Sequence, residues 1–259
     1  MINGLIGAGG KFGPLLLASV LSATEANLAL QVGSQLIDCK NPSAGALGAL
    51  EPIVIRSVVA EVAGRVPVSA TIGDLPCDAA VMVTAAKVVA ATGVDIVKVG
   101  LFGDSNPRAA IAALGATNLG KASLVAVLMA DQAPDFSLIP LLEKAGFIGV
   151  MLDTADKSSG ALPDVLDRKT LSDFISRAHA SGLAAGLAGS LRLEHIAGLV
   201  ALQPDIIGFR GALCNGGRTN GLDAACVRDV RAALDAAIAE AGQFNRSVVK
   251  RSVAKRSVA

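Results

Sequence analysis

Lysines and aspartates stand at the ends of short aliphatic runs, or inside them. Asp38 and Lys40 end one run, Lys98 lies inside a second, and Asp153 and Lys157 follow a third. Burial among apolar side chains and crowding by a second cation both lower the pKa of a lysine. The free amine that results can attack a carbonyl carbon and form an imine. These residues therefore predict lysine-based carbonyl chemistry, with carboxylates nearby to carry protons.

The same charges have a simpler interpretation, which is a structural ion network in which the lysines only pair with Asp38 and Asp153. An arginine, Arg210, follows the last of the aliphatic runs, so the charged set is larger than one pair needs. The size of the set favours chemistry, and the structural network stays as the alternative.

The elements that must position these residues alternate in type along the chain. Short aliphatic runs read as strands, and a longer helical pattern follows each one. The predicted strands are 15–20, 36–40, 66–71, 95–100, 123–128, 149–153, 183–189 and 205–211. Eight such units predict a single (β/α)₈ TIM barrel, with a doubly wound sheet as the alternative. We expect a flexible leader at 1–13, the catalytic barrel at 14–243 and a basic flexible tail at 244–259.

In a barrel of this kind the reactive groups lie at the carboxyl ends of the strands. The charged candidates fall on even-numbered strands, which contribute to the same layer of the barrel, so they are expected to converge. The loops after the last two strands contain Gly189, Ser190 and Gly211, and glycine-rich turns there commonly bind phosphate through backbone N–H groups. Arg210 or Arg218 could add charge-assisted hydrogen bonds to the same anion.

Composition excludes several other classes of protein. The net charge is +1 and the chain has no Trp and no Tyr, which argues against nucleic acid as a partner. No apolar run reaches the length of a membrane-spanning helix, so no membrane partner is expected. The four cysteines are scattered and form no CxxC pair, so neither a metal nor another cofactor is predicted. Scattered thiols also indicate a cytoplasmic protein.

Several segments together resemble one known family, the (5-formylfuran-3-yl)methyl phosphate synthases of methanofuran biosynthesis. The segments that carry the resemblance are 38–42 with 45–49, 68–74, 97–103, 151–157, 187–190 and 210–214. They occur in the same order and extend the resemblance over roughly residues 15–240.

The resemblance implies a lyase that is similar to class I aldolases and serves one-carbon metabolism. Such an enzyme condenses two molecules of glyceraldehyde 3-phosphate into a furan aldehyde phosphate, with loss of phosphate and water. By resemblance, Lys40 forms the imine, Lys98 accepts the proton, and Asp153 and Lys157 occupy further active-site positions. Asp38 is expected to contact the substrate.

Two alternative functions stay open. The first alternative is another aldolase or isomerase of sugar phosphates, which would differ in its product. The second is a barrel without catalysis that acts as a scaffold. We expect the chain to form a homo-oligomer and to bind a small triose phosphate.

Overall fold

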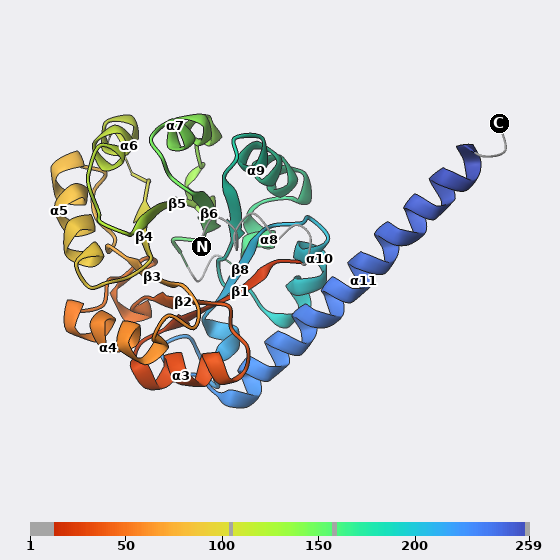
Figure 1. Cartoon of the computed structure of the whole chain (residues 1–259), viewed down its shortest axis with the longest axis horizontal. Helices are drawn as coiled ribbons and strands as arrows, with labels where there is room; N and C mark the ends of the chain where they lie inside the picture. Colours follow the sequence, from red (N-terminus) through yellow and green to blue (C-terminus); the bar gives the residue numbers. More distant parts are fainter. Residues whose placement is uncertain (1–12, 104–105, 157–159, 257–259) are drawn as a thin grey trace.

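Eight parallel strands close into a barrel in which each strand pairs with its sequence neighbours and β8 pairs with β1 (Figure 1). The computed structural model describes residues 13–103, 106–156 and 160–256. The strands are β1 (Leu15–Val20), β2 (Leu36–Cys39), β3 (Val68–Thr71), β4 (Ile96–Gly100), β5 (Ser123–Met129), β6 (Gly149–Asp153), β7 (Ala184–Leu187) and β8 (Ile206–Phe209). Every predicted strand is present, so the TIM barrel is confirmed and the doubly wound alternative is wrong.

A ring of helices surrounds the barrel, because each strand leads into at least one helix that packs back on the sheet (Figure 1). The helices are α3 (Ala23–Gln31), α4 (Pro52–Val62), α5 (Ala79–Ala90), α6 (Pro107–Gly115), α7 (Ile139–Lys144), α8 (Leu162–Val165), α9 (Arg168–Ala180), α10 (Ile196–Val200) and α11 (Ala224–Arg256). Short 3₁₀ turns lie in the loops at η1 (Pro42–Ala44), η2 (Ala130–Gln132), η3 (Phe136–Leu138), η4 (Leu193–His195) and η5 (Gly211–Leu213).

Polar side chains fix where several helices begin. Ser22 caps α3, and its Oγ accepts a hydrogen bond from the Glu25 backbone N–H at 3.2 Å. The Glu25 carboxylate turns back and accepts from the N–H of Leu21, one residue before the cap, at 2.8 Å. Asp78 caps α5 in the same manner. Hydrogen bonds between residues close in sequence therefore fix where these helices begin.

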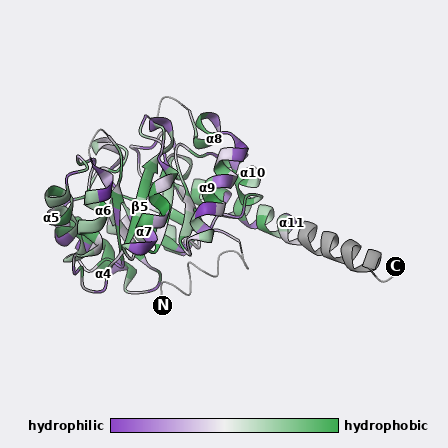
Figure 2. Ribbon diagram, turned by 90° about the horizontal axis from the view of Figure 1, so that it is seen from above, coloured by the Kyte–Doolittle hydropathy of each residue, from purple (hydrophilic) through white to green (hydrophobic). Residues whose placement is uncertain are grey.

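Strand residues alternate between two apolar cores. On β4, Val97 and Val99 belong to the larger core between sheet and helices, whereas Ile96 belongs to the smaller core inside the barrel. The hydropathy colours show the same division, with hydrophobic residues along β5 and hydrophilic ones on the outside of the helices (Figure 2). Because the period of a strand is two residues, Lys98 points inward with Ile96.

The structure can be compared with the expected domain boundary at the carboxyl end of the chain but not with the leader at the amino end. Residues 1–12 of the expected leader lie outside the described residues. The helix α11 runs through the boundary expected at 243/244 and extends beyond the ring of helices (Figure 1). Within the described ranges, no helix has both the length and the hydropathy needed to cross a membrane.

Phe174 of α9 should be a principal anchor of the outer core. Its side chain is fully buried, and its ring centroid lies 5.4 Å from that of Phe136. Replacing Phe174 with Ala should lower the free energy of unfolding by about 3–5 kcal/mol, because the lost ring leaves a cavity. Urea unfolding followed by circular dichroism measures this. The control Ile53→Ala, at a side chain that is 67% exposed, should change stability by about 0.5 kcal/mol or less. Equal losses in the two variants would contradict the packing argument.

Candidate active site

A pocket of about 520 Å³ opens at the carboxyl ends of the strands, where TIM barrels carry their reactive groups. Charged residues in its lining include Asp38, Lys40, Lys98, Asp153, Arg210 and Arg218. Gly189, Ser190 and Gly211 also line it. The convergence expected from the even-numbered strands is therefore present. Lys157 lies outside the described residues.

Asp38 and Lys98 form a buried ion pair inside the barrel. Lys98 Nζ donates to Asp38 Oδ2 at 2.9 Å, and the Asp38 side chain is fully buried. The hydroxyls of Ser69 and Ser19 donate to the same carboxylate at 2.6 and 3.2 Å. Burial acts to raise the pKa of Asp38, but Lys98 and Lys40 outweigh it and hold that pKa below its usual range. Asp38 is thus an anion that the surrounding donors keep charged.

Strand register explains how these partners meet. Asp38 of β2 lies opposite Ser19 of β1 on one side and opposite Ser69 of β3 on the other. All three side chains point into the barrel, because paired positions on neighbouring parallel strands share a face. Small hydroxyl side chains at these two positions leave room for the carboxylate and satisfy its oxygens.

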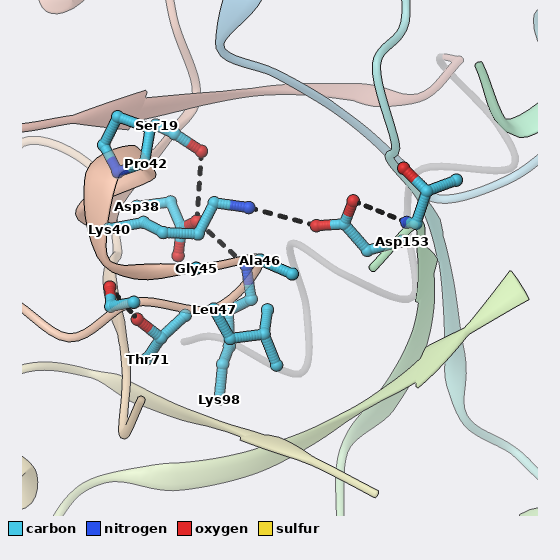
Figure 3. A network of polar contacts seen from close by, with 12 residues as sticks. Ser19, Asp38, Lys40, Pro42, Gly45, Ala46, Leu47, Thr71, Lys98 and Asp153 are labelled. Carbon is cyan, nitrogen blue, oxygen red and sulfur yellow. Dashed lines mark hydrogen bonds and ion pairs between the residues drawn. The ribbon is translucent and has the colours of Figure 1, made fainter. Parts of the chain in front are cut away.

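Lys40 reaches across the mouth of the barrel to the opposite strand. Its Nζ donates to Asp153 Oδ2 at 3.0 Å, as the close-up shows (Figure 3). The backbone N–H of Thr154 donates to the other oxygen of Asp153 at 2.8 Å. This ion pair joins β2 to β6, strands that lie opposite each other in the closed barrel.

The expectation that burial and crowding lower the pKa of a reactive lysine is wrong for Lys40. Burial does act in that direction, but the carboxylates of Asp153 and Asp38 outweigh burial and raise the pKa of Lys40. Asp153 lies 113 positions away along the chain, so its effect on Lys40 follows only from closure of the barrel. Lys40 therefore rests as an ammonium group and must lose its proton before it can attack a carbonyl.

The loop after β2 is held in place by Asp74. Both oxygens of Asp74 accept hydrogen bonds at 2.7 Å, one from the N–H of Ala46 and one from that of Leu47. Gly45 has φ +115°, and a Cβ there would lie 1.8 Å from Asp74 Oδ2. Position 45 therefore requires glycine, because any side chain there would collide with the Asp74 carboxylate. The result is a loop folded inward beside Lys40.

Asp131 does the same for the loop after β6. Its two oxygens accept from the N–H groups of Ala155 and Asp156 at 2.8 and 2.7 Å. The segment that carries Asp153 therefore leaves the strand in a fixed direction. The sequence analysis did not select Asp131 or Asp74 as site residues, although Asp74 ends one of the segments of the resemblance.

Arg210 is bound entirely by the protein. Its guanidinium donates to the Glu25 carboxylate, with the shorter contact at 2.5 Å, and to the backbone oxygens of Ser19, Arg218 and Asn220. These contacts use all five of its N–H donors. Arg210 lines the pocket but joins the loop after β8 to the start of α3, a role that its position in the sequence did not indicate.

Arg218 takes a different position above the pocket. Its Nη2 donates to the backbone oxygens of Pro42 and Gly45 in the loop after β2, at 3.0 Å for Gly45. Burial lowers the pKa of Arg218, while Asp153 and Asp74 act in the opposite direction. The long side chain thus spans from the loop after β8 to the loop that follows Lys40.

No thiol is among the described residues that line this pocket. Burial and the neighbouring Asp38 raise the pKa of Cys39, whose side chain points away from the barrel interior into the outer core. Among the described residues, no group of three or more His, Cys, Asp or Glu side chains is arranged to hold a metal ion.

Solved structures of similar shape support the barrel fold of this chain and carry no argument about its function. Phosphoribosyl anthranilate isomerase from Thermus thermophilus superposes with a TM-score of 0.60 and covers 87% of this chain and 98% of its own. Only 14% of aligned residues are identical, so the similarity is one of architecture.

Sequence relatives are much closer. The (5-formylfuran-3-yl)methyl phosphate synthase of Methanosarcina mazei is 38% identical over 220 residues, 80% of this chain and 93% of that protein. The enzyme of the same name from Methanocaldococcus jannaschii is 36% identical over 232 residues, 84% of this chain and 98% of that protein. A Methylorubrum extorquens relative, to which the same name is provisionally assigned, is 40% identical over 86% of this chain and 92% of its own length.

A family model described as 4-HFC-P synthase matches residues 16–231, from β1 into α11. The match includes Asp38, Lys40, Lys98 and Asp153, the residues that the barrel brings together. Since this model and these relatives cover most of the barrel, the chain belongs to the 4-HFC-P synthase family.

Proposed function

We propose that this protein condenses two molecules of glyceraldehyde 3-phosphate into (5-formylfuran-3-yl)methyl phosphate for the synthesis of a methanofuran-type cofactor. One phosphate and two molecules of water leave, which balances the atoms. The observation that carries the proposal is a buried lysine, Lys40, paired with Asp153 at the mouth of a barrel of this family. The fold, the pocket and the family membership all agree with a lyase that acts on a small phosphorylated aldehyde.

Lys40 is the proposed nucleophile. Asp153 Oδ2, 3.0 Å from Nζ, takes the proton that the ammonium must lose. The amine attacks the aldehyde carbon of one triose phosphate, and water leaves as the imine forms. The iminium then draws electrons from the adjacent carbon, which can lose a proton to give an enamine. The enamine attacks the aldehyde of the second triose and joins the two three-carbon units.

Lys98 is the proposed proton acceptor for the steps on either side of that bond. Lys98 is the ammonium partner of Asp38, 2.9 Å from its Oδ2, so it first gives a proton to a leaving hydroxyl and then, as the free amine, takes one from the substrate carbon. The donors on Asp38 hold the carboxylate in one orientation. Asp38 is thus proposed to act through Lys98 and to contact the substrate at the floor of the pocket.

Phosphate binding is proposed for the loops after β7 and β8. Gly189 and Ser190 have positive φ values of 111° and 48°, so the chain turns sharply where it borders the pocket. Gly211 opens η5 at the end of the next strand. Arg210 supports the position of that turn through its contacts with Glu25. Lys157, which follows Asp153 by four residues, is a further proposed phosphate or proton contact.

The product identifies the function. Purified protein incubated with glyceraldehyde 3-phosphate should form the furan aldehyde phosphate, detected by mass spectrometry, together with one inorganic phosphate per product. An aldolase of sugar phosphates would instead leave both phosphates on an open-chain sugar. Absence of any product, with substrate bound, would support a scaffold and contradict the proposal.

Replacing Lys40 with Ala should remove the imine. Borohydride reduction of the wild-type protein with substrate should add a stable mass to Lys40, located by peptide mapping. Lys40→Ala should show no such adduct, and kcat should fall by about 10³-fold or more because the nucleophile is gone. The control Lys121→Ala, at an exposed lysine paired with Asp95, should keep both the adduct and the activity. An adduct on another lysine in the wild type would overturn the assignment.

Replacing Lys98 with Met should separate imine formation from product formation. The variant keeps the length of the side chain and loses its amine, so the adduct on Lys40 should still form. Furan production should fall by about 10²- to 10⁴-fold, the usual contribution of a positioned acid–base group. Turnover within about threefold of wild type would exclude Lys98 as the proton acceptor.

The raised pKa of Lys40 predicts how imine formation depends on pH. Only the free amine reacts, and below its pKa the free fraction rises tenfold per pH unit. The rate of imine formation, measured by borohydride quenching, should therefore rise by about tenfold per unit from about pH 7 to 9, without a plateau.

In Asp153→Asn the main counter-charge is gone and burial lowers the pKa of Lys40. The profile should then level off at a lower pH than in the wild-type protein. A wild-type plateau near neutral pH, or an unshifted profile in the variant, would contradict the electrostatic assignment.

A further inference from the structure

The proposed reaction, on which this inference rests, brings two phosphate groups into one pocket. The enamine carbon of one triose bonds to the aldehyde carbon of the other, so the two phosphate-bearing carbons lie at the ends of a five-carbon chain from which the imine carbon branches. Two dianions in one pocket repel each other unless each meets its own donors. A single phosphate site therefore leaves the second substrate without a partner.

Among the described residues inside the barrel, no positive charge is left over for a second phosphate. Lys40 and Lys98 are matched by Asp153 and Asp38, each pair within 3.0 Å. Arg210 has all its donors bound by protein, including the Glu25 carboxylate. The second anion must be bound by a group outside this set.

Arg218 is such a group. It is half-buried, lines the pocket, and is anchored through Nη2 to two backbone oxygens. Within the described residues, its Nε and Nη1 have no hydrogen-bond partner, so up to three N–H donors remain for a ligand. Arg192, the third arginine of the pocket lining, is exposed and faces Glu194 at 3.5 Å.

The position of Arg218 matches the far end of the substrate chain. Gly189, at the loop proposed for the first phosphate, packs against Thr154, since a Cβ on Gly189 would lie 3.0 Å from the Thr154 nitrogen. That contact places the β7 loop at the Asp153 end of the Lys40–Asp153 pair. Arg218, bound to the oxygens of Pro42 and Gly45, lies at the Lys40 end.

We propose that Arg218 forms a second phosphate subsite at the β2 side of the barrel mouth. The phosphate of one triose binds to the loop after β7, and the phosphate of the other binds to the free donors of Arg218. Asp74 is its positioning residue, because it fixes the loop that supplies the Pro42 and Gly45 oxygens. The carbons to be joined then lie between the two phosphates, over Lys40.

An unreactive probe of matched length tests the subsite without turnover. Arabinitol 1,5-bisphosphate has five carbons and a phosphate at each end, and arabinitol 5-phosphate has one phosphate; neither has a carbonyl group. Calorimetry with the wild-type chain should show the bisphosphate binding about 10- to 100-fold tighter than the monophosphate, the gain expected when charged hydrogen bonds form at a second site.

In Arg218→Gln, this preference should fall to about threefold or less, while the affinity for the monophosphate stays within about twofold. Arg218→Lys keeps the positive charge and loses the paired donors of the planar guanidinium, so it should retain an intermediate preference for the bisphosphate. The control Arg177→Gln, at an exposed arginine of α9 paired with Asp173, should behave as wild type. Thermal unfolding checks that each variant is folded.

Several outcomes would overturn the proposal. One is a wild-type chain without preference for the bisphosphate, and another is a preference that survives in Arg218→Gln. A preference lost in Arg192→Gln but not in Arg218→Gln would assign the subsite to Arg192 instead. Failure to form the furan product, with the binding results as expected, would contradict the proposed function and still support the second phosphate subsite.

Discussion

The mutual neutralisation of two lysines and two aspartates inside the barrel is the constraint on which the rest of the site depends. A charge in so confined a space is costly unless an opposite charge meets it at hydrogen-bond distance. Lys98 with Asp38 and Lys40 with Asp153 meet that condition. Removing one member of such a pair commonly costs about 3–5 kcal/mol. The four residues are therefore coupled, and each can change protonation only as its partner responds.

Carboxylates from odd-numbered strands give this charged centre its fixed surroundings. Glu25, after β1, binds Arg210 and the N–H of Leu222 in the loop after β8. Asp74, after β3, binds two backbone N–H groups of the loop after β2, and Asp131, after β5, binds two of the loop after β6. Even-numbered strands thus carry the two central ion pairs, and acidic residues that follow odd-numbered strands fix the loops beside them.

The alternation of short apolar runs and helical patterns was enough to predict the barrel, because a covered parallel sheet needs strands that are apolar on both faces. The period of two residues also puts Asp38 and Lys40 on one face of β2. What the pattern could not supply was which charges would meet. The Lys40–Asp153 pair joins residues 113 positions apart, and the attachment of Arg210 to Glu25 depends on how β8 closes against β1. Such contacts follow from closure of the sheet and have no local signature.

The raised pKa of Lys40 follows from the same closure. Lys40 ends an apolar run, so from the sequence burial is expected to lower its pKa. In the closed barrel Asp153 faces it from the opposite strand and, together with Asp38, raises that pKa. A site that holds its nucleophile as an ammonium has its own internal counter-ion, so a phosphorylated substrate gains little from the central lysines. Recognition of the phosphates must then come from groups at the rim. The loops after β7 and β8, with the free donors of Arg218 between β8 and β2, are where the barrel offers them.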